Sequence, residues 1–260
     1  MQPAPDAPAR PPRRRLGWLL AAALTADLAA GVVARAADPS ALWHIVHGRC
    51  VPDQQQKHNP APCAAVNLGQ GYAVLKDLRG DYQFLLIPTA RVSGIDDPAI
   101  LAPHAPNYWQ PAWNARRYLE QRAGRTVPRD VLSLAINSSV GRSQDQLHIH
   151  VDCVRPYVRA ALRQHQAAIG PRWAAFPVPL AGQHYRAMRI DQPEPGATNP
   201  FRLLARSTPP QDMRWHTLVL VGTTFGGRPG FVLLDNRADL AAGDRASGEQ
   251  LQDHSCALLQ

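Results

Sequence analysis

Two histidines, His148 and His150, stand two residues apart in the segment 146–153, QLHIHVDC, and are the side chains best placed to do chemistry. Polar and apolar residues alternate there, which predicts a strand with both imidazoles on one face, roughly 6.5–7 Å apart at the backbone. A neutral imidazole is a nucleophile near neutral pH, and neighbouring groups can fix its tautomer and stabilise developing charge. Two other interpretations stay open: the polar outer face of an edge strand, and a zinc-binding pair, although no third ligand stands at a convincing spacing.

The loop 137–144, NSSVGRSQ, precedes the histidines and is small, polar and rich in hydrogen-bond donors. Its backbone and hydroxyl groups can bind a phosphate, and the planar guanidinium of Arg142 suits a diphosphate. These neighbours favour nucleophilic attack on a phosphoryl group. The formal net charge of +8 agrees with an anionic partner, such as a phosphorylated small molecule or an acidic lipid surface. No run of Lys and Arg is long enough to indicate a nucleic-acid tail.

The elements that would position these residues can be inferred from the periodicity of the chain. Four segments have the pattern of strands: 71–76, 81–88, 134–137 and 146–153. Three have the pattern of helices: 41–50, 107–123 and 156–169. Their order predicts an α+β fold in which helices pack on an antiparallel sheet. Farther along, 218–221 and 231–234 predict a hairpin across the glycine-rich turn 223–230, and 191–200 predicts a loop.

The N-terminus has the features of an export or anchoring signal. Arginines at positions 13–15 precede the apolar run 16–34, which is nearly long enough to span a bilayer but contains Asp27. A small-x-small pattern at 34–36 suits signal cleavage. The segment is therefore either a retained single-pass anchor or a removed signal peptide, and both place the rest of the chain outside the membrane. A composition of 45% hydrophobic and 18% charged residues predicts that this remainder folds.

The cysteines agree with export, because an even number in an exported chain indicates disulfides. There are four: Cys50, Cys63, Cys153 and Cys256. Three pairings are open, of which the local one joins Cys50 to Cys63 and leaves Cys153 with Cys256. The sequence contains no Cys-x-x-Cys, so a zinc ribbon or a thioredoxin-type redox site is unsupported.

The His-Ile-His segment and the loop before it resemble the histidine triad superfamily. Members of that superfamily bind nucleotides, and the middle histidine of a His-x-His-x-His strand attacks the α-phosphate. Here Gln146 takes the first position, His148 the middle one and His150 the last. More specifically, the chain resembles the bacterial CDP-diacylglycerol pyrophosphatases, also called CDP-diacylglycerol phosphatidylhydrolases. The segments that carry this resemblance are CVPDQQQ, NPAPCA, GYAVLKDLRG, LLIPTARVSGI, LAINSSVGRSQ, HIHVDC and the C-terminal DHSC.

The resemblance implies a histidine triad-like catalytic core over 38–170, preceded by a basic N-terminus and anchor or signal segment over 1–37. A smaller α+β extension would occupy 171–260. The implied reaction hydrolyses CDP-diacylglycerol to CMP and phosphatidate through a nucleotidyl-histidine intermediate, in the inner membrane with the catalytic domain on the periplasmic side. It requires no cofactor and no metal ligands, although a divalent cation could bind the diphosphate. The implied partners are CDP-diacylglycerol, CMP and membrane lipid, without nucleic acid.

Residue roles follow from the same resemblance. Three residues would be catalytic: His148 as the nucleophile, His150 on the phosphate, and Ser143 with its hydroxyl toward the phosphate or leaving group. Six would bind substrate: Asn137 near the phosphate and ribose, Asp77 on the ribose hydroxyls, Leu78 against the base, Arg91 on the second phosphate, and Arg142 and Gln146 near the diphosphate. Two alternatives stay open: a nucleotidyl transferase or hydrolase acting on other nucleoside diphosphate conjugates, and a nucleotide- or lipid-binding module without turnover.

Overall fold

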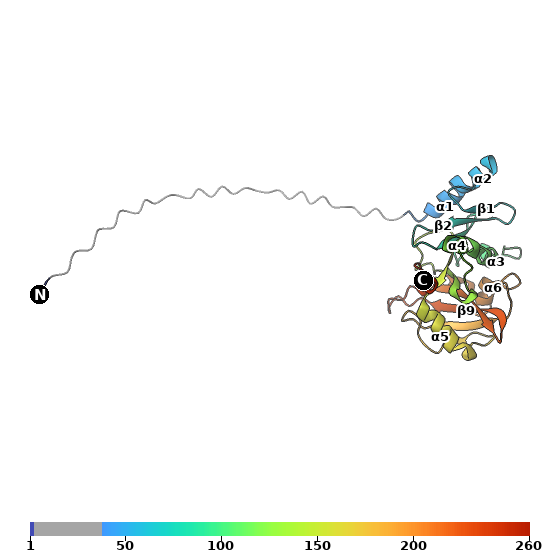
Figure 1. The fold of residues 1–260 in the computed structure, drawn as a ribbon. Helices are drawn as coiled ribbons and strands as arrows, with labels where there is room; N and C mark the ends of the chain where they lie inside the picture. Colours follow the sequence, from blue (N-terminus) through green and yellow to red (C-terminus); the bar gives the residue numbers. More distant parts are fainter. Residues whose placement is uncertain (3–37) are drawn as a thin grey trace. The chain divides into compact units, whose positions relative to one another are not determined.

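One antiparallel sheet runs through the residues that the computed structural model describes, 1–2 and 38–260 (Figure 1). Its order is β1-β2-β3-β5-β4-β8-β9-β7-β6, with β10 paired to β5. The strands are β1 (Ala65–Asn67), β2 (Tyr72–Lys76), β3 (Phe84–Pro88), β4 (Leu132–Ile136), β5 (Ile149–Val154), β6 (Ala174–Ala175), β7 (Arg186–Ile190), β8 (His216–Phe225), β9 (Arg228–Arg237) and β10 (Gln252–Asp253). The predicted α+β class with an antiparallel sheet is confirmed.

Short helices pack on both faces of this sheet (Figure 1). They are α1 (Ala41–Ile45), α2 (Val51–Lys57), α3 (Trp109–Asn114), α4 (Arg116–Ala123), α5 (Pro156–Gln164) and α6 (Pro200–Ala205). A single π-helical turn joins α1 to α2, so this helix runs beyond the predicted 41–50. The helix predicted over 107–123 is divided at Ala115 and ends where Gly124 takes a left-handed conformation.

The larger apolar core lies on one face of the sheet. Ile149, Val151 and Cys153 of β5 point into it, where they join the buried indoles of Trp109 and Trp113 from α3. Burial of aliphatic side chains of this kind contributes about 1.5–3 kcal/mol each. The central strand is thereby fixed, and its alternate residues must point to the opposite face.

That opposite face carries two smaller apolar clusters with a gap between them. Val46 and Leu85 belong to the cluster under α1 and α2, while Val158 and Leu234 belong to the cluster under α5. His150 lies between the two, because its strand neighbours in register are Leu85 of β3 and Ala135 of β4. The fold therefore opens a polar site over the middle of the sheet.

Two sequence predictions about strands were wrong in detail. The strand predicted over 146–153 begins only at Ile149 and lies between β3 and β4, so the edge-strand interpretation is also wrong. The glycine-rich turn predicted over 223–230 is confined to Gly226 and Gly227. Both glycines have positive φ, as a type I′ hairpin turn requires, so the flanking residues can continue the ladder.

Two disulfides join the cysteines in the local pairing. Cys50 is bonded to Cys63 and Cys153 to Cys256, across sequence separations of 13 and 103 residues. The second bond fastens the C-terminal segment to β5. In the view of Figure 1 the C-terminus is marked at one side of the folded part, at a height between α4 and α5.

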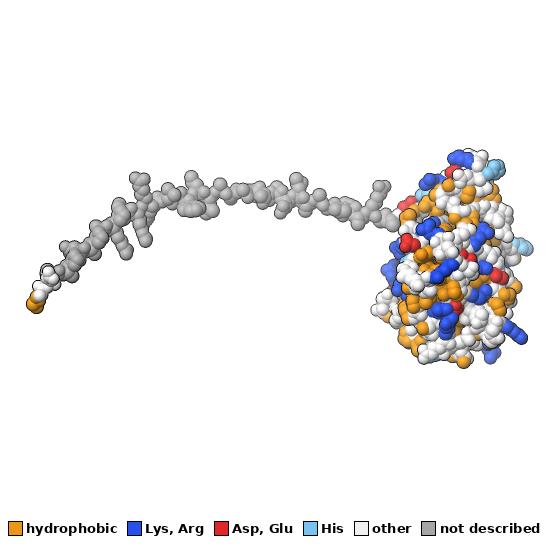
Figure 2. Space-filling model, viewed as in Figure 1, with side chains coloured by type: hydrophobic (Ala, Val, Ile, Leu, Met, Phe, Trp, Pro, Cys, Tyr) orange, Lys and Arg blue, Asp and Glu red, His pale blue; other side chains and the backbone are white. Residues whose placement is uncertain are grey.

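The sheet is continuous through the ranges predicted as the core, 38–170, and the extension, 171–260, since β4 pairs with β8. The apolar run 16–34, predicted as an anchor or signal, lies outside the described residues. Within the described ones, no helix has the length and hydropathy to cross a membrane. On the face seen in Figure 2, Lys and Arg side chains are scattered among apolar and uncharged ones rather than gathered in a stripe.

Candidate active site

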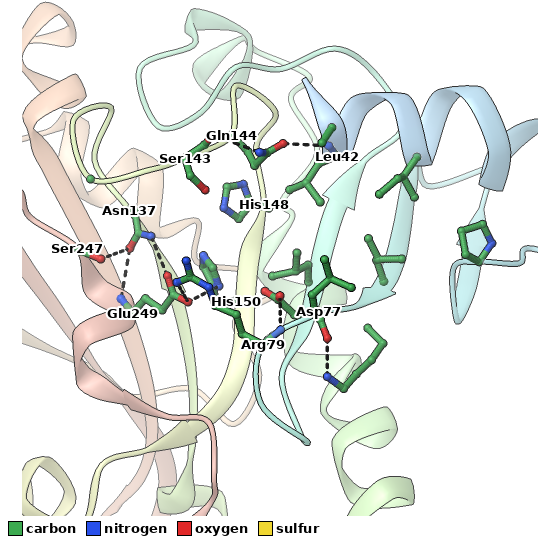
Figure 3. A pocket seen from close by; sticks show the side chains of 18 of the residues that line it. Leu42, Asp77, Arg79, Asn137, Ser143, Gln144, His148, His150, Ser247 and Glu249 are labelled. Atoms are coloured by element: carbon green, nitrogen blue, oxygen red, sulfur yellow. Dashed lines mark hydrogen bonds and ion pairs between the residues drawn. The ribbon is translucent and has the colours of Figure 1, made fainter. Parts of the chain in front are cut away.

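A cavity of about 570 Å³ opens over the central strands, and it contains both histidines (Figure 3). One wall is apolar and comes from α1, β2 and β3, with Leu42, Leu75 and Leu85. The other walls are polar. Figure 3 shows the two imidazoles one above the other, with Asn137 and Glu249 on one side and Asp77 on the other. An amphiphilic cavity of this size accommodates a ligand with an uncharged ring and phosphate groups.

His148 is buried, and the surrounding backbone determines its tautomer. Its Nδ1 lies 2.7 Å from the carbonyl oxygen of Gln146. A carbonyl oxygen only accepts, so Nδ1 carries the proton and Nε2 keeps its lone pair. Burial lowers the pKa of His148, and this outweighs the opposite effect of the Gln146 hydrogen bond. His148 is therefore neutral and nucleophilic at neutral pH.

His150 has the opposite tautomer. Its ring centroid lies 4.8 Å from that of His148, in an edge-on arrangement. The side-chain amide of Gln83 donates to Nδ1 at 2.5 Å, which leaves the proton on Nε2. Burial, followed by the neighbouring His148, lowers the pKa of His150 to about 3. Its Nε2–H is buried and has no partner among the described residues, so it is free to donate to a ligand.

Glu249, in a 3₁₀ turn near the C-terminus (Gly248–Leu251), faces His150 from the polar wall. Its Oε1 lies 3.8 Å from His150 Nδ1 and 3.4 Å from Gln83 Nε2. Asn137 donates to its Oε2 at 3.4 Å and accepts the Glu249 N–H at 3.2 Å. Burial alone would raise the pKa of Glu249, but His150, Gln83 and other neighbours lower it overall, so the carboxylate is ionised.

His254 supports Glu249 from behind. Its Nδ1 lies 2.6 Å from Oδ2 of the buried Asp152, and its Nε2 lies 3.5 Å from Glu249 Oε1. The hydrogen bond to Asp152 raises the pKa of His254. The turn after β2 packs directly on the backbone and Cβ of His254, and a Cβ on Gly80 would overlap them. Gly80 also has a positive φ of 59°, so glycine is required there on both counts.

Comparison with known proteins identifies the family. Residues 37–260 match the family described as CDP-diacylglycerol pyrophosphatase. A relative from Yersinia pestis named CDP-diacylglycerol pyrophosphatase is 41% identical over 246 residues, which is 93% of this chain and 94% of the relative. The chain belongs to the CDP-diacylglycerol pyrophosphatase family. The resemblance inferred from short motifs therefore extends over residues 37–260 of this family member.

Six of the residues predicted for a pyrophosphatase site come together at the cavity: Asp77, Leu78, Asn137, Ser143, His148 and His150. Leu78 is fully exposed at the rim. The Ser143 hydroxyl has no hydrogen-bond partner within the described part of the chain, and it lies above His148 in Figure 3. This arrangement leaves the hydroxyl free for a ligand.

Three other predicted substrate-binding residues do not line this cavity. Arg142 forms ion pairs with Asp96 and Asp145, which hold it behind the loop. Arg91 reaches Ser40 and lies over the ring of Trp43, so it supports α1 instead. The resemblance and the charge of each arginine suggested a phosphate contact, but partners within the protein hold both guanidinium groups elsewhere.

Gln146 also points away from the cavity. Its amide nitrogen donates to the carbonyl oxygens of Pro88 and Ala90, at 3.0 and 2.8 Å. The Gln146 side chain therefore holds the segment after β3 in place. What it offers to the site is its backbone carbonyl, which orients His148.

The candidate site and its surroundings also include groups that the sequence analysis missed. Gln83, Glu249 and His254 form the polar support behind His150. His254 belongs to the DHSC motif, which was noticed without a role, whereas Glu249 has no local signal. Three cationic side chains line the cavity in place of the arginines predicted to do so: Arg49, Lys76 and Arg79.

A zinc site gains no support from the geometry. Among the described residues, the group of potential ligands that lie close together is Asp152 with Cys153 and Cys256. Those sulfurs are joined in a disulfide, and a disulfide sulfur is not a thiolate ligand. His148 and His150 each form a hydrogen bond within the protein and line the cavity, so their burial does not require a metal ion.

Proposed function

We propose that this chain hydrolyses CDP-diacylglycerol to CMP and phosphatidate by two successive displacements at the phosphorus of the cytidylyl group. One observation carries the proposal: a free imidazole lone pair on His148 lies beside a free imidazole N–H on His150 in the same cavity. The first group can attack a phosphorus atom, and the second can donate to the oxygen on which charge accumulates. The family assignment supplies the substrate class.

In the first displacement, Nε2 of His148 forms a bond to the cytidylyl phosphorus while the bond to the phosphatidate oxygen breaks. The leaving group departs as a phosphate anion, so it needs little help from an acid. The carbonyl of Gln146 accepts from Nδ1–H and stabilises the positive charge that His148 acquires. In the second displacement, water attacks the same phosphorus, the P–N bond breaks with its electron pair returning to Nε2, and the proton lost by water passes to solvent as CMP leaves and neutral His148 is restored.

The polar and apolar walls of the cavity would bind different parts of the substrate. The half-buried Asp77 would accept hydrogen bonds from the ribose hydroxyls, and the apolar wall with Leu42 and Leu75 would contact the base. The exposed Arg79 side chain has a 3.8 Å contact with Glu249 as its one ion pair among the described residues, and it would turn to a phosphate oxygen. Such a scheme requires no cofactor. A divalent cation would act only by binding the diphosphate itself.

The proposed function also includes a location for the chain at the membrane. A retained or cleaved apolar segment at 16–34 would deliver the chain to the outer side of the inner membrane. The two disulfides agree with that side, because they persist in oxidising compartments. The cavity wall begins at Ala41, seven residues after the apolar run, so an extended linker would span at most about 25 Å.

The test is an assay of the full chain in detergent with CDP-diacylglycerol, followed by CMP release. A panel of other cytidine and adenosine diphosphate conjugates runs beside it. Release that is fastest from CDP-diacylglycerol supports the proposal. Faster release from another conjugate would identify that conjugate as the preferred substrate. CMP binding without turnover of any donor would indicate a binding module.

Acid pH is expected to reduce the rate only below the ordinary histidine range. Burial lowers the pKa of His148 from 6.5, so the nucleophile stays neutral as the pH falls through 6.5 and is protonated at a lower value. We expect kcat/KM to decline on the acid side with a midpoint below 6.5. A midpoint above 6.5 in the same profile would contradict a buried, neutral nucleophile.

The substitution Asp77→Ala is expected to raise KM by about 10- to 100-fold with a smaller effect on kcat, since hydrogen bonds to charged groups are worth about 1.5–3 kcal/mol. It should also abolish discrimination between ribose and 2′-deoxyribose substrates. Asp81→Ala serves as the control, since Asp81 is exposed in the same connection and does not line the cavity. Equal discrimination by wild type and Asp77→Ala would refute the ribose contact.

A further inference from the structure

We propose that Glu249 is a positioning residue that fixes the side-chain amide of Gln83 and, through it, the donor tautomer of His150. The inference rests on the proposed function, in which His150 Nε2–H donates to the substrate phosphate. Glu249 has no assigned role in that reaction scheme. Its place behind the imidazole, and the groups around it, indicate what it does.

The amide of Gln83 is the link between Glu249 and His150. Its nitrogen lies 2.5 Å from His150 Nδ1 and 3.4 Å from Glu249 Oε1, so one NH₂ group serves both acceptors. Rotated by half a turn, the amide would present its oxygen to His150 instead. An amide oxygen cannot donate to a carboxylate, so an ionised Glu249 disfavours the rotated form.

Gln83 has no other reason to keep this orientation. It is fully buried, and its own side-chain oxygen has no hydrogen-bond partner among the residues the structure describes. Without the carboxylate, either orientation would make one hydrogen bond with His150 and leave the other half of the amide unpaired, so no other described residue would hold the amide nitrogen toward His150. The choice between the two orientations therefore depends on Glu249.

Glu249 is itself held on several sides. Asn137 donates to Oε2, His254 approaches Oε1 at 3.5 Å, and Asp152 holds the far side of the His254 ring. A carboxylate on the wall of a phosphate cavity repels the ligand. Surrounding it with donors reduces that repulsion while keeping an acceptor beside Gln83, as a positioning role requires.

Rotation of Gln83 would reverse the chemistry of His150. With the amide oxygen at Nδ1, the proton would reside on Nδ1, and Nε2 would turn a lone pair toward the phosphate. The site would then lose a hydrogen-bond donor and gain a repulsive contact. Losing one preorganised donor of this kind lowers kcat by about 10²–10³-fold.

The test begins with Glu249→Gln, which keeps the size of the side chain and removes its charge. We expect kcat for CMP release to fall about 10²-fold, in line with loss of one transition-state donor, with KM unchanged or lower because a negative charge is removed. Glu120→Gln is the matched control: Glu120 is also half-buried and accepts a backbone N–H, from Val127, away from the cavity. That variant should keep wild-type kcat.

Nitrogen-15 NMR of the imidazoles reads the tautomers without substrate. Wild-type protein should show Nε2–H on His150 and Nδ1–H on His148, and Glu249→Gln should show a mixture at His150 alone. An unchanged His150 tautomer in Glu249→Gln would overturn the inference, whatever the rate. If the wild type releases no CMP, the proposed function fails, while the NMR result still decides the positioning role.

A double-mutant cycle with Gln83→Met removes the link and also covers the case in which one variant folds poorly. If Glu249 acts through Gln83, then Glu249→Gln should cost little further activity in the Gln83→Met background. Full additivity of the two effects on kcat would overturn the inference, because Glu249 would then act by another route.

Discussion

His148→Ala is expected to lower the rate of CMP release by at least about 10⁴-fold, since removal of a catalytic nucleophile costs about that much or more. The variant should fold normally. His148 precedes β5 and lies on the cavity, so its loss removes one hydrogen bond to the Gln146 carbonyl and little of the apolar core. The effect on rate should therefore far exceed the effect on the midpoint of thermal unfolding.

Detection of the proposed cytidylyl-histidine intermediate is a second test of this prediction. Wild-type protein mixed briefly with substrate and quenched in alkali, in which a phosphoramidate survives, should carry a CMP adduct by mass spectrometry, and His148→Ala should not. Two in-line displacements each invert the phosphorus, so the configuration is retained overall. His165→Ala is the control, because His165 is half-buried against Phe176 and does not line the cavity. An undiminished rate in His148→Ala would remove this residue from the mechanism.

Removing the Cys153–Cys256 disulfide with paired alanines is expected to lower the free energy of unfolding by about 5 kcal/mol, the loop-entropy value for a loop of about 100 residues. The observed separation is 103 residues. Activity should fall as well, since β10 pairs with β5 through only Gln252 and Asp253, next to the residues that support His150. Denaturant unfolding and CMP release measure the two effects separately.

The second disulfide is the natural control for the first. Cys50 and Cys63 are separated by 13 residues, for which the same relation gives a smaller loss of about 3 kcal/mol. The pair lies under α1 and α2, behind the apolar wall rather than behind His150. Equal losses of stability from the two alanine pairs would refute the loop-length argument. Full activity without Cys153–Cys256 would show that the C-terminal segment stays in place without it.

The sequence correctly predicted features that depend on residues close together in the chain. The alternation around His148 and His150 predicted a strand, and the structure confirms one from Ile149 to Val154, with His148 just before it, because period two is a property of neighbouring residues. It could not place that strand in the centre of the sheet. The position of β5 in the sheet depends on its pairing with β3 and β4, and the residues near β5 in the sequence do not indicate which strands it pairs with.

The site residues that were missed or misplaced have a common physical origin. Asp152 and His254 touch across 102 residues, and Asn137 and Glu249 across 112, so no spacing rule connects them. The prediction that Arg142 lies at the diphosphate was wrong for a related reason. Its charge was visible in the sequence, but the charge does not say whether the guanidinium turns to a ligand or to Asp96.

The arrival of Glu249 and His254 so near the end of the chain has a consequence for the timing of activity. Because a chain is synthesised from its N-terminus, His148 is made before Glu249 and His254, so a polypeptide that stops before them lacks the groups that we propose to orient His150. Oxidation then has to fasten the segment to β5. On the proposed mechanism, turnover would stay slow until Glu249 and His254 have reached their places beside His150.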